Sequence, residues 1–497
     1  MLIGLGAVLA GATPRLPATF RPTVSPDRAV DPERARDALD PTAESSPTLV
    51  ADPTRPDRQV LVNRVDRPRT GCAVRRSSNG GLTWASVDLP PPVGSFAVAC
   101  FAPDASFAAD GALYVAFTSL GSAPSASVTP AATWLAVSYD GAATFTAPRL
   151  IAGPRSFQLR IAADATAPRT VYATWLQAAA TTSSGIADGQ NPIVVSRSDD
   201  AGASWSTPVA VSPPARTRVV APSIVVAARS SPVVAYLDVG DDRLDYSGAH
   251  GGRAGDPYLG TWSVVVARSS DGGRRWKETA LGDVHPVQRF SQLRPPTPTL
   301  AVDRAGRRAF VATTSAESNV SQVVTWSSHD GATTFDARLL GDASRERNQF
   351  LPALAVAPGG RLDVVYYEAG ADPTGDTVRA LMRSSNDHGR SFSRGVPLSH
   401  AEFDRFGGFG SAEGLADLGS RTSLLSTARR TLAVWGDARA SAPGEGREDL
   451  ATAAVSWNDA TPARAAARWG GGGLATGGVL AIGLRRIQRR RGRAAQN

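Results

Sequence analysis

The chain has 497 residues, of which 42% are hydrophobic and 20% charged, so it carries enough apolar content for a large folded core. Its formal charge is +8, but six arginines fall within residues 485–497, which leaves +8 − 6 = +2 for the remainder. A body so close to neutrality excludes nucleic-acid binding as the main activity. The five histidines and two cysteines form no cluster with metal-ligand spacing, so neither a metal site nor a cofactor is expected.

The N-terminal segment indicates export. Residues 1–12 are apolar and end in Ala10-Gly11-Ala12, which is typical of a signal-peptide cleavage site, although the basic residues that open a complete signal peptide are missing. We interpret this segment as the remnant of a signal peptide. Residues 13–47 are rich in Pro, Asp and Arg and show little hydrophobic periodicity. They are predicted to form a flexible lead-in to the folded domain.

From residue 48 to residue 460 the chain repeats a pair of short apolar runs joined by a turn. One such pair is Phe107 to Asp110 with Ala112 to Phe117, where aromatic and β-branched residues are typical of strands. Seven pairs occur, and their first runs begin near residues 48, 107, 159, 223, 300, 354 and 414. Regular recurrence on this scale predicts a repeat architecture in which each unit packs against its neighbours.

A second pattern, Ser-x-Asp/Asn-x-Gly/Ala-x-x-aromatic, follows the first six pairs. Its third positions are Asn79, Asp140, Asp200, Asp271, Asp330 and Asp387. Short Asp and Asn side chains accept hydrogen bonds from nearby backbone N–H groups, and the small residue that follows permits a positive φ. Each copy is therefore predicted to be a structural hairpin turn between a third and a fourth strand. The copies lack the alternating oxygen ligands and distal Glu of a calcium loop.

Units of about four short strands predict an all-β fold, a β-propeller of seven blades. Six blades with one irregular unit is the alternative. The seventh unit, which pairs Gly414 to Asp417 with Leu432 to Trp435, lacks a convincing fourth strand. We expect a strand from the N-terminal segment to complete it and to close the ring.

The two cysteines fall in neighbouring units. Cys72 is in the predicted third strand of the first blade, and Cys100 is near the first strand of the second blade. A disulfide across the blade junction is consistent with an exported protein in an oxidising compartment. Two buried free thiols are the alternative.

The C-terminal segment has the features of a membrane anchor. After a linker, residues 461–469, an uncharged stretch covers residues 470–484 and a basic tail covers residues 485–497. Trp469 before this stretch and the arginines after it are typical of a span with its basic end inside the cell. Because an ordinary span needs about 20 residues, a flexible linker with a basic end is the alternative. The sequence thus predicts a monomeric propeller outside the cell, anchored to the membrane or secreted.

Strand order sorts the candidate binding residues by face. In an up-and-down blade, the starts of first strands and the ends of second strands share one face, and the repeated turn lies on the other. Arginines precede several first strands, and acidic residues with a tyrosine end several second strands: Arg160, Arg218, Arg294 and Arg347 in the first group, Asp238, Tyr367, Glu368 and Asp437 in the second. Arginines beside carboxylates can hold a carboxylated sugar by bidentate ion pairing.

The repeated turn motif resembles the Asp box, or BNR repeat, of the sialidase-like superfamily, over roughly residues 48–460. Sialidases of this superfamily hold the substrate carboxylate with three arginines and use a Tyr nucleophile, a Glu that assists it, and an Asp acid/base. That Tyr departs from the usual pair of carboxylates. The resemblance implies Arg160, Arg294 and Arg347 as the substrate-binding arginines. It implies Tyr367 and Glu368 as the nucleophile pair and Asp104 as the acid.

Two functions follow from these patterns. The Phe/Tyr-Arg-Ile-Pro motif of sialidases is absent near the first blade, where Phe20-Arg21-Pro22-Thr23 is a poor match, and neighbouring Tyr and Glu on one strand point to opposite faces. These observations favour an exported, surface-anchored propeller that binds a glycan or a surface protein. The alternative is an exo-glycosidase of sialidase type that removes terminal acidic sugars.

Overall fold

A computed structural model describes residues 22–457, apart from internal gaps at 38–39, 93–98, 121–129, 183–184, 188, 229, 243–259, 287–296, 304, 318–319, 342–346, 370–375, 410–416 and 442–443. Several predictions lie outside the described residues: the signal-peptide remnant 1–12, the linker 461–469, the candidate anchor 470–484, the basic tail 485–497 and Arg294. Within the described part of the chain, no helix is both long and apolar enough to cross a membrane.

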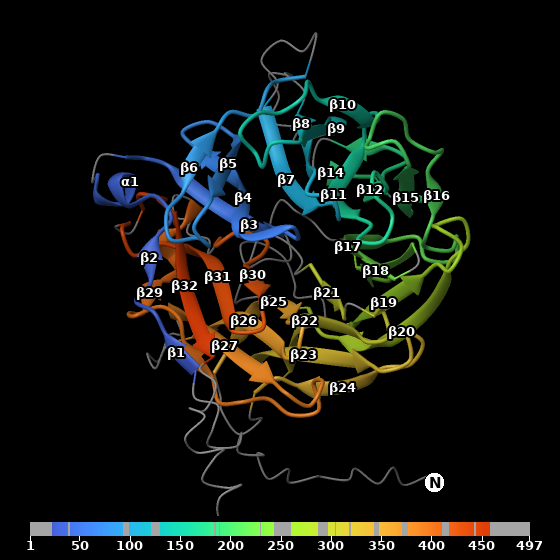
Figure 1. Ribbon diagram of the computed structural model, residues 1–497. Helices are drawn as coiled ribbons and strands as arrows, with labels where there is room; N and C mark the ends of the chain where they lie inside the picture. The colour runs from blue at the N-terminus through green and yellow to red at the C-terminus, as the bar shows by residue number, and fades with distance from the viewer. Residues whose placement is uncertain are drawn as a thin grey trace, which may run out of the picture.

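Seven antiparallel sheets surround a central axis, which confirms the seven-bladed propeller (Figure 1). Blade one contains β3 (Ala43–Asp52), β4 (Arg55–Arg67), β5 (Gly71–Ser77) and β6 (Ala85–Val87). Blade two contains β7 (Ala99–Phe107), β8 (Leu113–Leu120), β9 (Pro130–Ser138) and β10 (Arg149–Ala152). Blade three contains β11 (Ser156–Ala163), β12 (Val171–Gln177), β15 (Ile193–Ser198) and β16 (Val209–Ala210), with a small hairpin of β13 (Thr181–Thr182) and β14 (Gly185–Ile186).

The ring continues in chain order. Blade four contains β17 (Val219–Ala227), β18 (Ser231–Asp238), β19 (Trp262–Arg268) and β20 (Lys277–Val284). Blade five contains β21 (Thr299–Val302), β22 (Ala309–Glu317), β23 (Val320–Ser328) and β24 (Asp336–Leu339). Blade six contains β25 (Gln349–Val356), β26 (Leu362–Ala369), β27 (Thr377–Ser385) and β28 (Val396–Pro397), and β29 (Phe403–Asp404) also pairs with β27; a short 3-10 helix, Arg405–Gly407, follows.

Blade seven closes the ring with both ends of the described chain. It contains β30 (Ser423–Ser426), β31 (Arg430–Asp437) and β32 (Asp449–Trp457), and its outermost strand is the N-terminal β1 (Pro22–Val24). Thr23 pairs with Ser456 in an antiparallel register, and β2 (Arg28–Ala29) pairs further along the same edge of β32. The expectation that an N-terminal strand completes the seventh blade is confirmed.

Two expectations about this part of the chain were wrong. The described part of the segment 13–47 is not a flexible lead-in, because it contains β1, β2 and α1 (Pro32–Arg36). These elements are too short to show hydrophobic periodicity, and contacts with other blades fix them, such as the ion pair from Arg34 to Glu44 at 2.8 Å. The first strand of blade seven was also misplaced, since Asp417 lies outside any strand and β30 begins at Ser423.

The second strand of each blade lies between two neighbouring blades and is buried on both faces. In β12 the six residues Val171 to Leu176 are all buried, and they include Tyr172 and Trp175, which are fully buried. A continuous apolar run is typical of a strand covered on both sides. Each large side chain buried in this way contributes about 1.5–3 kcal/mol, so packing between blades stabilises the ring.

The repeated motif forms the predicted hairpin turn in all six copies. In the second copy, Asp140 Oδ1 accepts hydrogen bonds from Ser138 Oγ at 2.8 Å and from the backbone N–H groups of Ala143 and Thr144 at 2.9 Å. Thr144 also donates through its hydroxyl to the other carboxylate oxygen, and these bonds lower the pKa of Asp140. The corresponding bond from the serine reaches Asn79, Asp200, Asp271, Asp330 and Asp387. The motif therefore serves the turn rather than a ligand site.

A disulfide joins the first two blades. Cys72 in β5 is bonded to Cys100 in β7, with 5.4 Å between their Cα atoms. Of the two alternatives left open by the sequence, the structure thus selects the pairing across the blade junction.

Candidate functional site

The first strands of all seven blades surround the central axis of the ring (Figure 1). A cavity of about 350 Å³, called the channel below, is lined by residues from every one of these strands. Seven of the lining residues occupy equivalent positions: Thr48, Asp104, Arg160, Ser223, Thr299, Ala353 and Ser423. Arg421 and Thr297 also line the cavity and precede their first strands, so it lies at the face where these strands begin.

A β-bulge precedes the channel position in five of the seven first strands. The pairing register shifts there in β3, β7, β11, β17 and β25. A residue of positive φ marks each bulge: Ser46, Ala102, Gln158, Ala221 and Leu351. Proline follows four of these residues, and proline is compatible with a bulge because it donates no ladder hydrogen bond. A bulge redirects the side chain that follows it, so this repeated feature builds the channel lining.

Polar side chains of the channel lining connect neighbouring blades. Ser423 Oγ accepts a hydrogen bond from the backbone N–H of Leu49 at 2.9 Å, which joins blade seven to blade one. Asp104 Oδ2 accepts from the N–H of Ile161 at 3.0 Å, which joins blade two to blade three in the same way. The equivalent positions therefore have a structural role wherever they carry a side chain that can accept such a bond.

The structure brings two of the predicted site residues together in the channel. Asp104 Oδ1 lies 3.8 Å from Arg160 Nη1 and accepts a hydrogen bond from Thr48 Oγ1 at 3.0 Å. Its other carboxylate oxygen accepts the hydrogen bond from the N–H of Ile161, so both oxygens of Asp104 have partners. The residue is only 7% exposed. This carboxylate can orient Arg160, and its predicted role as the acid stays a prediction.

Sequence analysis missed a second channel arginine. Arg421 Nε donates to the carbonyl oxygen of Pro47 at 3.1 Å, and Nη2 donates to that of Pro103 at 2.5 Å. Within the part of the chain that the structure describes, no carboxylate forms an ion pair with Arg421. Burial lowers the pKa of its guanidinium, and nearby Arg160 lowers it further. Arginines that precede a first strand were among the predicted site residues, and Arg421 is one of them. It was missed because the first strand of blade seven was placed too early in the sequence.

The channel lining has a surplus of positive charge. Its charged members among the described residues are Arg160, Arg421 and Asp104, which sum to +2 − 1 = +1. Asp104 pairs with Arg160 alone, so the guanidinium of Arg421 has no carboxylate partner among the described residues of this partly desolvated space. Because burial strengthens electrostatic interactions, this arrangement favours an anionic group in the cavity.

The remaining predicted residues lie on blade six. Tyr367 is fully buried, and its hydroxyl donates to the carbonyl oxygen of Gly436 in blade seven at 2.8 Å. Burial raises the pKa of Tyr367 well above 10, which disfavours the phenolate of a nucleophile. Glu368 projects from the opposite face of β26 and contacts Arg347 and Arg379. Arg347 and Glu368 are thus brought together, whereas Tyr367 belongs to the interface between blades six and seven.

A buried charged cluster lies at the junction of blades seven and one. Arg64 Nε is 2.6 Å from Asp66 Oδ1, and Arg64 Nη2 is 3.9 Å from Asp417 Oδ2. Glu448 is fully buried beside this group. Burial raises the pKa of Glu448 well above 4.5, and the neighbouring Asp417 and Asp66 raise it further, while Arg64 acts in the opposite direction. Among the described residues, no group of three or more His, Cys, Asp or Glu could hold a metal ion.

The raised pKa of Glu448 predicts a pH-dependent stability. The folded state keeps the proton of Glu448 above the pH at which the unfolded chain releases it, so this residue lowers stability increasingly as pH rises. Glu448→Gln, which is neutral and similar in shape, should match the wild type below about pH 4 and become relatively more stable towards pH 8. Melting temperatures measured across this range test the prediction. Glu33→Gln, which changes an exposed glutamate, is the control. A difference in melting temperature between Glu448→Gln and the wild type that stays the same at every pH would contradict the prediction.

Comparisons with known proteins show only a distant likeness. No protein-family model and no curated protein matches the chain. Among solved structures it is similar to a protein of unknown function from Dyadobacter fermentans, with 13% identity and a TM-score of 0.48, over 88% of this chain and 99% of that one. It is similar to an ulvan lyase, with 12% identity and a TM-score of 0.45, over 82% and 93% of the two chains. It is also similar to Trypanosoma rangeli sialidase in complex with sialic acid, with 11% identity and a TM-score of 0.38, over 83% and 54%.

Proposed function

We propose that this protein is an exported β-propeller that binds an anionic glycan in its central channel. The observation that carries the proposal is Arg421, a channel arginine whose hydrogen bonds go to two backbone carbonyl groups and whose pKa is lowered by burial and by the charge of Arg160. A carboxylate on a sugar would compensate the surplus charge by charge-assisted hydrogen bonds from both guanidinium groups.

Location outside the cell is part of this proposal. The disulfide between Cys72 and Cys100 supports it, because such bonds persist mainly in oxidising compartments. The apolar residues 1–12 and the segment 470–484 provide an export signal and a membrane anchor in this proposal.

Glycoside hydrolysis is the second candidate function. The position of Asp104 beside Arg160 in the channel favours it, because an acid next to a bound acidic sugar could protonate a leaving group. In this scheme Asp104 would be the acid, whereas Arg347 and Glu368 lie outside the cavity lining and Tyr367 is fully buried between blades six and seven. Turnover of a fluorogenic sialic-acid glycoside by the full chain, lost in Asp104→Asn, would support hydrolysis.

Arg421→Gln should weaken the binding of acidic sugars. Loss of charge-assisted hydrogen bonds worth about 1.5–3 kcal/mol raises the dissociation constant about 10- to 100-fold. Calorimetric titration of the full chain with galacturonate and N-acetylneuraminate, and with galactose as the neutral comparison, measures this effect.

Arg390→Gln is the matched control, because Arg390 is an exposed arginine in the repeated turn of blade six, on the opposite face. Equal binding of galactose and galacturonate, or equal loss of affinity in the two variants, would contradict the proposed site.

A further inference from the structure

A second arginine pair lies on blade six, outside the channel. Arg347 precedes β25, Arg379 is in β27, and both guanidinium groups reach the same oxygen of Glu368 at the end of β26. Arg379 Nη2 is 3.2 Å from Glu368 Oε1, and Arg347 Nη1 is 3.7 Å from the same atom. Gln349 Nε2 donates to the other oxygen at 3.4 Å. One carboxylate therefore holds two arginines side by side.

Exposure differs sharply within this group. The side chain of Glu368 is 6% exposed, whereas those of Arg347 and Arg379 are 34% and 29% exposed. The carboxylate is thus largely withdrawn from solvent while both cationic groups remain accessible. The nearby Asp376 forms an ion pair with Arg405 at 3.4 Å. The three members of the group sum to +2 − 1 = +1, as they do in the channel.

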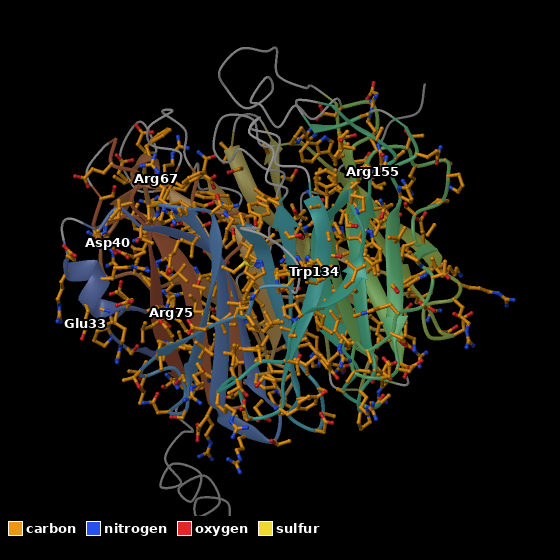
Figure 2. The ribbon with its side chains drawn as sticks, turned by 90° about the horizontal axis from the view of Figure 1, so that it is seen from above. Glu33, Asp40, Arg67, Arg75, Trp134 and Arg155 are labelled. Atoms are coloured by element: carbon orange, nitrogen blue, oxygen red, sulfur yellow. A yellow bond between two sulfur atoms is a disulfide. The ribbon has the colours of Figure 1, made fainter. Side chains whose placement is uncertain are left out.

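The group on blade six and the channel cavity are reached from the same face. Arg347 precedes a first strand and Glu368 lies at the end of a second strand, and these two kinds of position share one face. Figure 2 illustrates this topology, since Arg155 before β11 and Arg67 at the end of β4 both lie near the same face. The repeated turns lie on the other face.

Strand β25 connects the two sites. Gln349 pairs with Glu368 near the start of β25, and Ala353 of the same strand lines the cavity. Four residues that include the bulge at Leu351 separate these positions by about 10–13 Å along the strand. That distance exceeds one sugar ring, so a ligand that occupies both sites must have several residues. Arg421 precedes the first strand of blade seven, but its guanidinium donates to Pro47 of blade one and Pro103 of blade two, so a ligand that reaches it from blade six must extend into the channel.

We propose that Arg347, Arg379 and Glu368 form a second anion subsite, and that the ligand is a polysaccharide with repeated anionic groups, either carboxylates or sulfate esters. The inference rests on the proposed function of the channel. Two subsites joined by one chain-like ligand raise the affinity well above that of either subsite alone, because the second contact forms within the complex. Glu368 is a positioning residue that holds the two guanidinium groups together.

The test compares polymers with a monomer. The full chain is titrated with polygalacturonate, dextran sulfate, uncharged dextran and monomeric galacturonate. The double variant Arg347→Gln/Arg379→Gln should bind the anionic polymers at least about 10-fold more weakly. It should bind monomeric galacturonate as the wild type does, because the monomer occupies the channel alone. Polygalacturonate and dextran sulfate distinguish a carboxylate ligand from a sulfated one.

Two further variants distinguish loss of the subsite from loss of folding and from a general loss of positive charge. Arg347→Gln alone keeps the 3.2 Å pair between Arg379 and Glu368 and should show a smaller loss of the same kind. Arg390→Gln/Arg394→Gln removes two exposed arginines from the other face of blade six and should bind as the wild type does. Equal losses in the two double variants, or unchanged polymer binding by Arg347→Gln/Arg379→Gln, would overturn the subsite.

The variant Arg421→Gln tests the channel independently of the subsite on blade six. Arg421→Gln should weaken the binding of both the monomer and the polymers. If Arg421→Gln binds galacturonate normally while the blade-six variants still lose polymer binding, the proposed channel function fails and the subsite on blade six stands without it. If only Arg421→Gln loses affinity, the channel stands and the subsite on blade six fails.

Discussion

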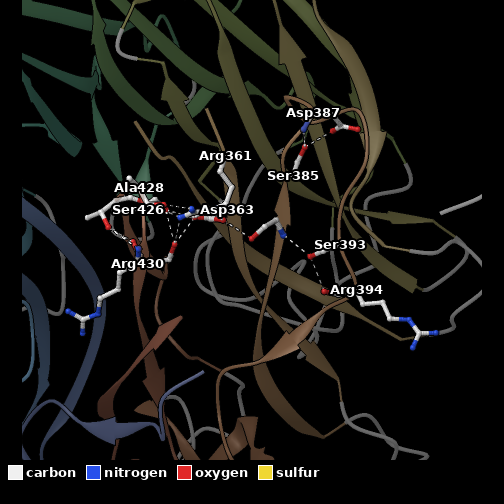
Figure 3. Close-up of polar contacts among 12 residues, drawn as sticks. Arg361, Asp363, Ser385, Asp387, Ser393, Arg394, Ser426, Ala428 and Arg430 are labelled. Carbon is white, nitrogen blue, oxygen red and sulfur yellow. Dashed lines mark hydrogen bonds and ion pairs between the residues drawn. The ribbon is translucent and has the colours of Figure 1, made fainter. Parts of the chain in front are cut away.

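Replacing Arg361 by Met is expected to lower the unfolding free energy by about 3–5 kcal/mol, because it leaves a buried carboxylate without its cation. Asp363 is fully buried in β26 and forms a bidentate pair with Arg361, with Nε–Oδ1 and Nη2–Oδ2 distances of 3.0 Å (Figure 3). Thr431 donates to the same carboxylate at 2.6 Å. Arg361 also donates to the carbonyl oxygens of Thr427 and Ala428 in blade seven. The substitution therefore removes a link between blades six and seven as well as a charge.

Chemical denaturation followed by tryptophan fluorescence measures this effect. Arg383→Met is the matched control: this arginine of the same blade donates to the Tyr366 hydroxyl and to the carbonyl oxygen of Ser393, and no described carboxylate pairs with it. Its loss should cost about 1.5–3 kcal/mol, the range for hydrogen bonds that involve a charged group. Equal losses for the two variants would show that the ion pair adds nothing beyond its hydrogen bonds.

The features that sequence analysis predicted correctly depend on local interactions. The turn around Asp140 is closed by bonds that span two to four residues, so its pattern is visible in a short stretch of chain. Repetition of the turn and of the strand pairs then favours seven blades, and the structure selects seven over the alternative of six. The ring closure was also predicted, because the seventh unit lacked a fourth strand and had to obtain it from elsewhere.

The features that it missed depend on residues far apart in the chain. Arg421 reaches the carbonyl oxygens of Pro47 and Pro103, which precede it by more than three hundred residues. Arg379 is in the third strand of its blade, whereas the sequence analysis examined only the starts of first strands and the ends of second strands. Four of the five bulges left a visible signal, since proline follows the bulge residue at Pro47, Pro103, Pro222 and Pro352, and Pro298 lies at the equivalent position of blade five. That repeat could have identified the channel positions.

Deletion of residues 1–30 should destabilise the propeller more than any single substitution on its surface. The deletion removes β1 and β2, which cover the outer edge of β32, and it removes the buried side chain of Val30. Val24 packs against the apolar core of blades six and seven. Loss of the buried Val30 alone costs about 1.5–3 kcal/mol, and the half-buried Val24 adds to it, so the unfolding free energy should fall by at least about 1.5 kcal/mol. Differential scanning calorimetry compares this chain with one that lacks only residues 1–21 and keeps β1 and β2. The difference in their stability is the contribution of these two strands.

The same deletion tests how the ring is closed. Ser25 N–H donates to the carbonyl oxygen of Ala454, and Val30 N–H donates to that of Leu450, both at 2.8 Å. Without these partners the nine-residue strand β32 becomes an exposed edge, which is a template for pairing between molecules. Light scattering should therefore show association of the deleted chain, and a synthetic peptide of residues 22–31 should suppress it by adding back the strand. A monomeric deletion variant with the melting temperature of the longer chain would show that contacts within β30 to β32 suffice to close blade seven.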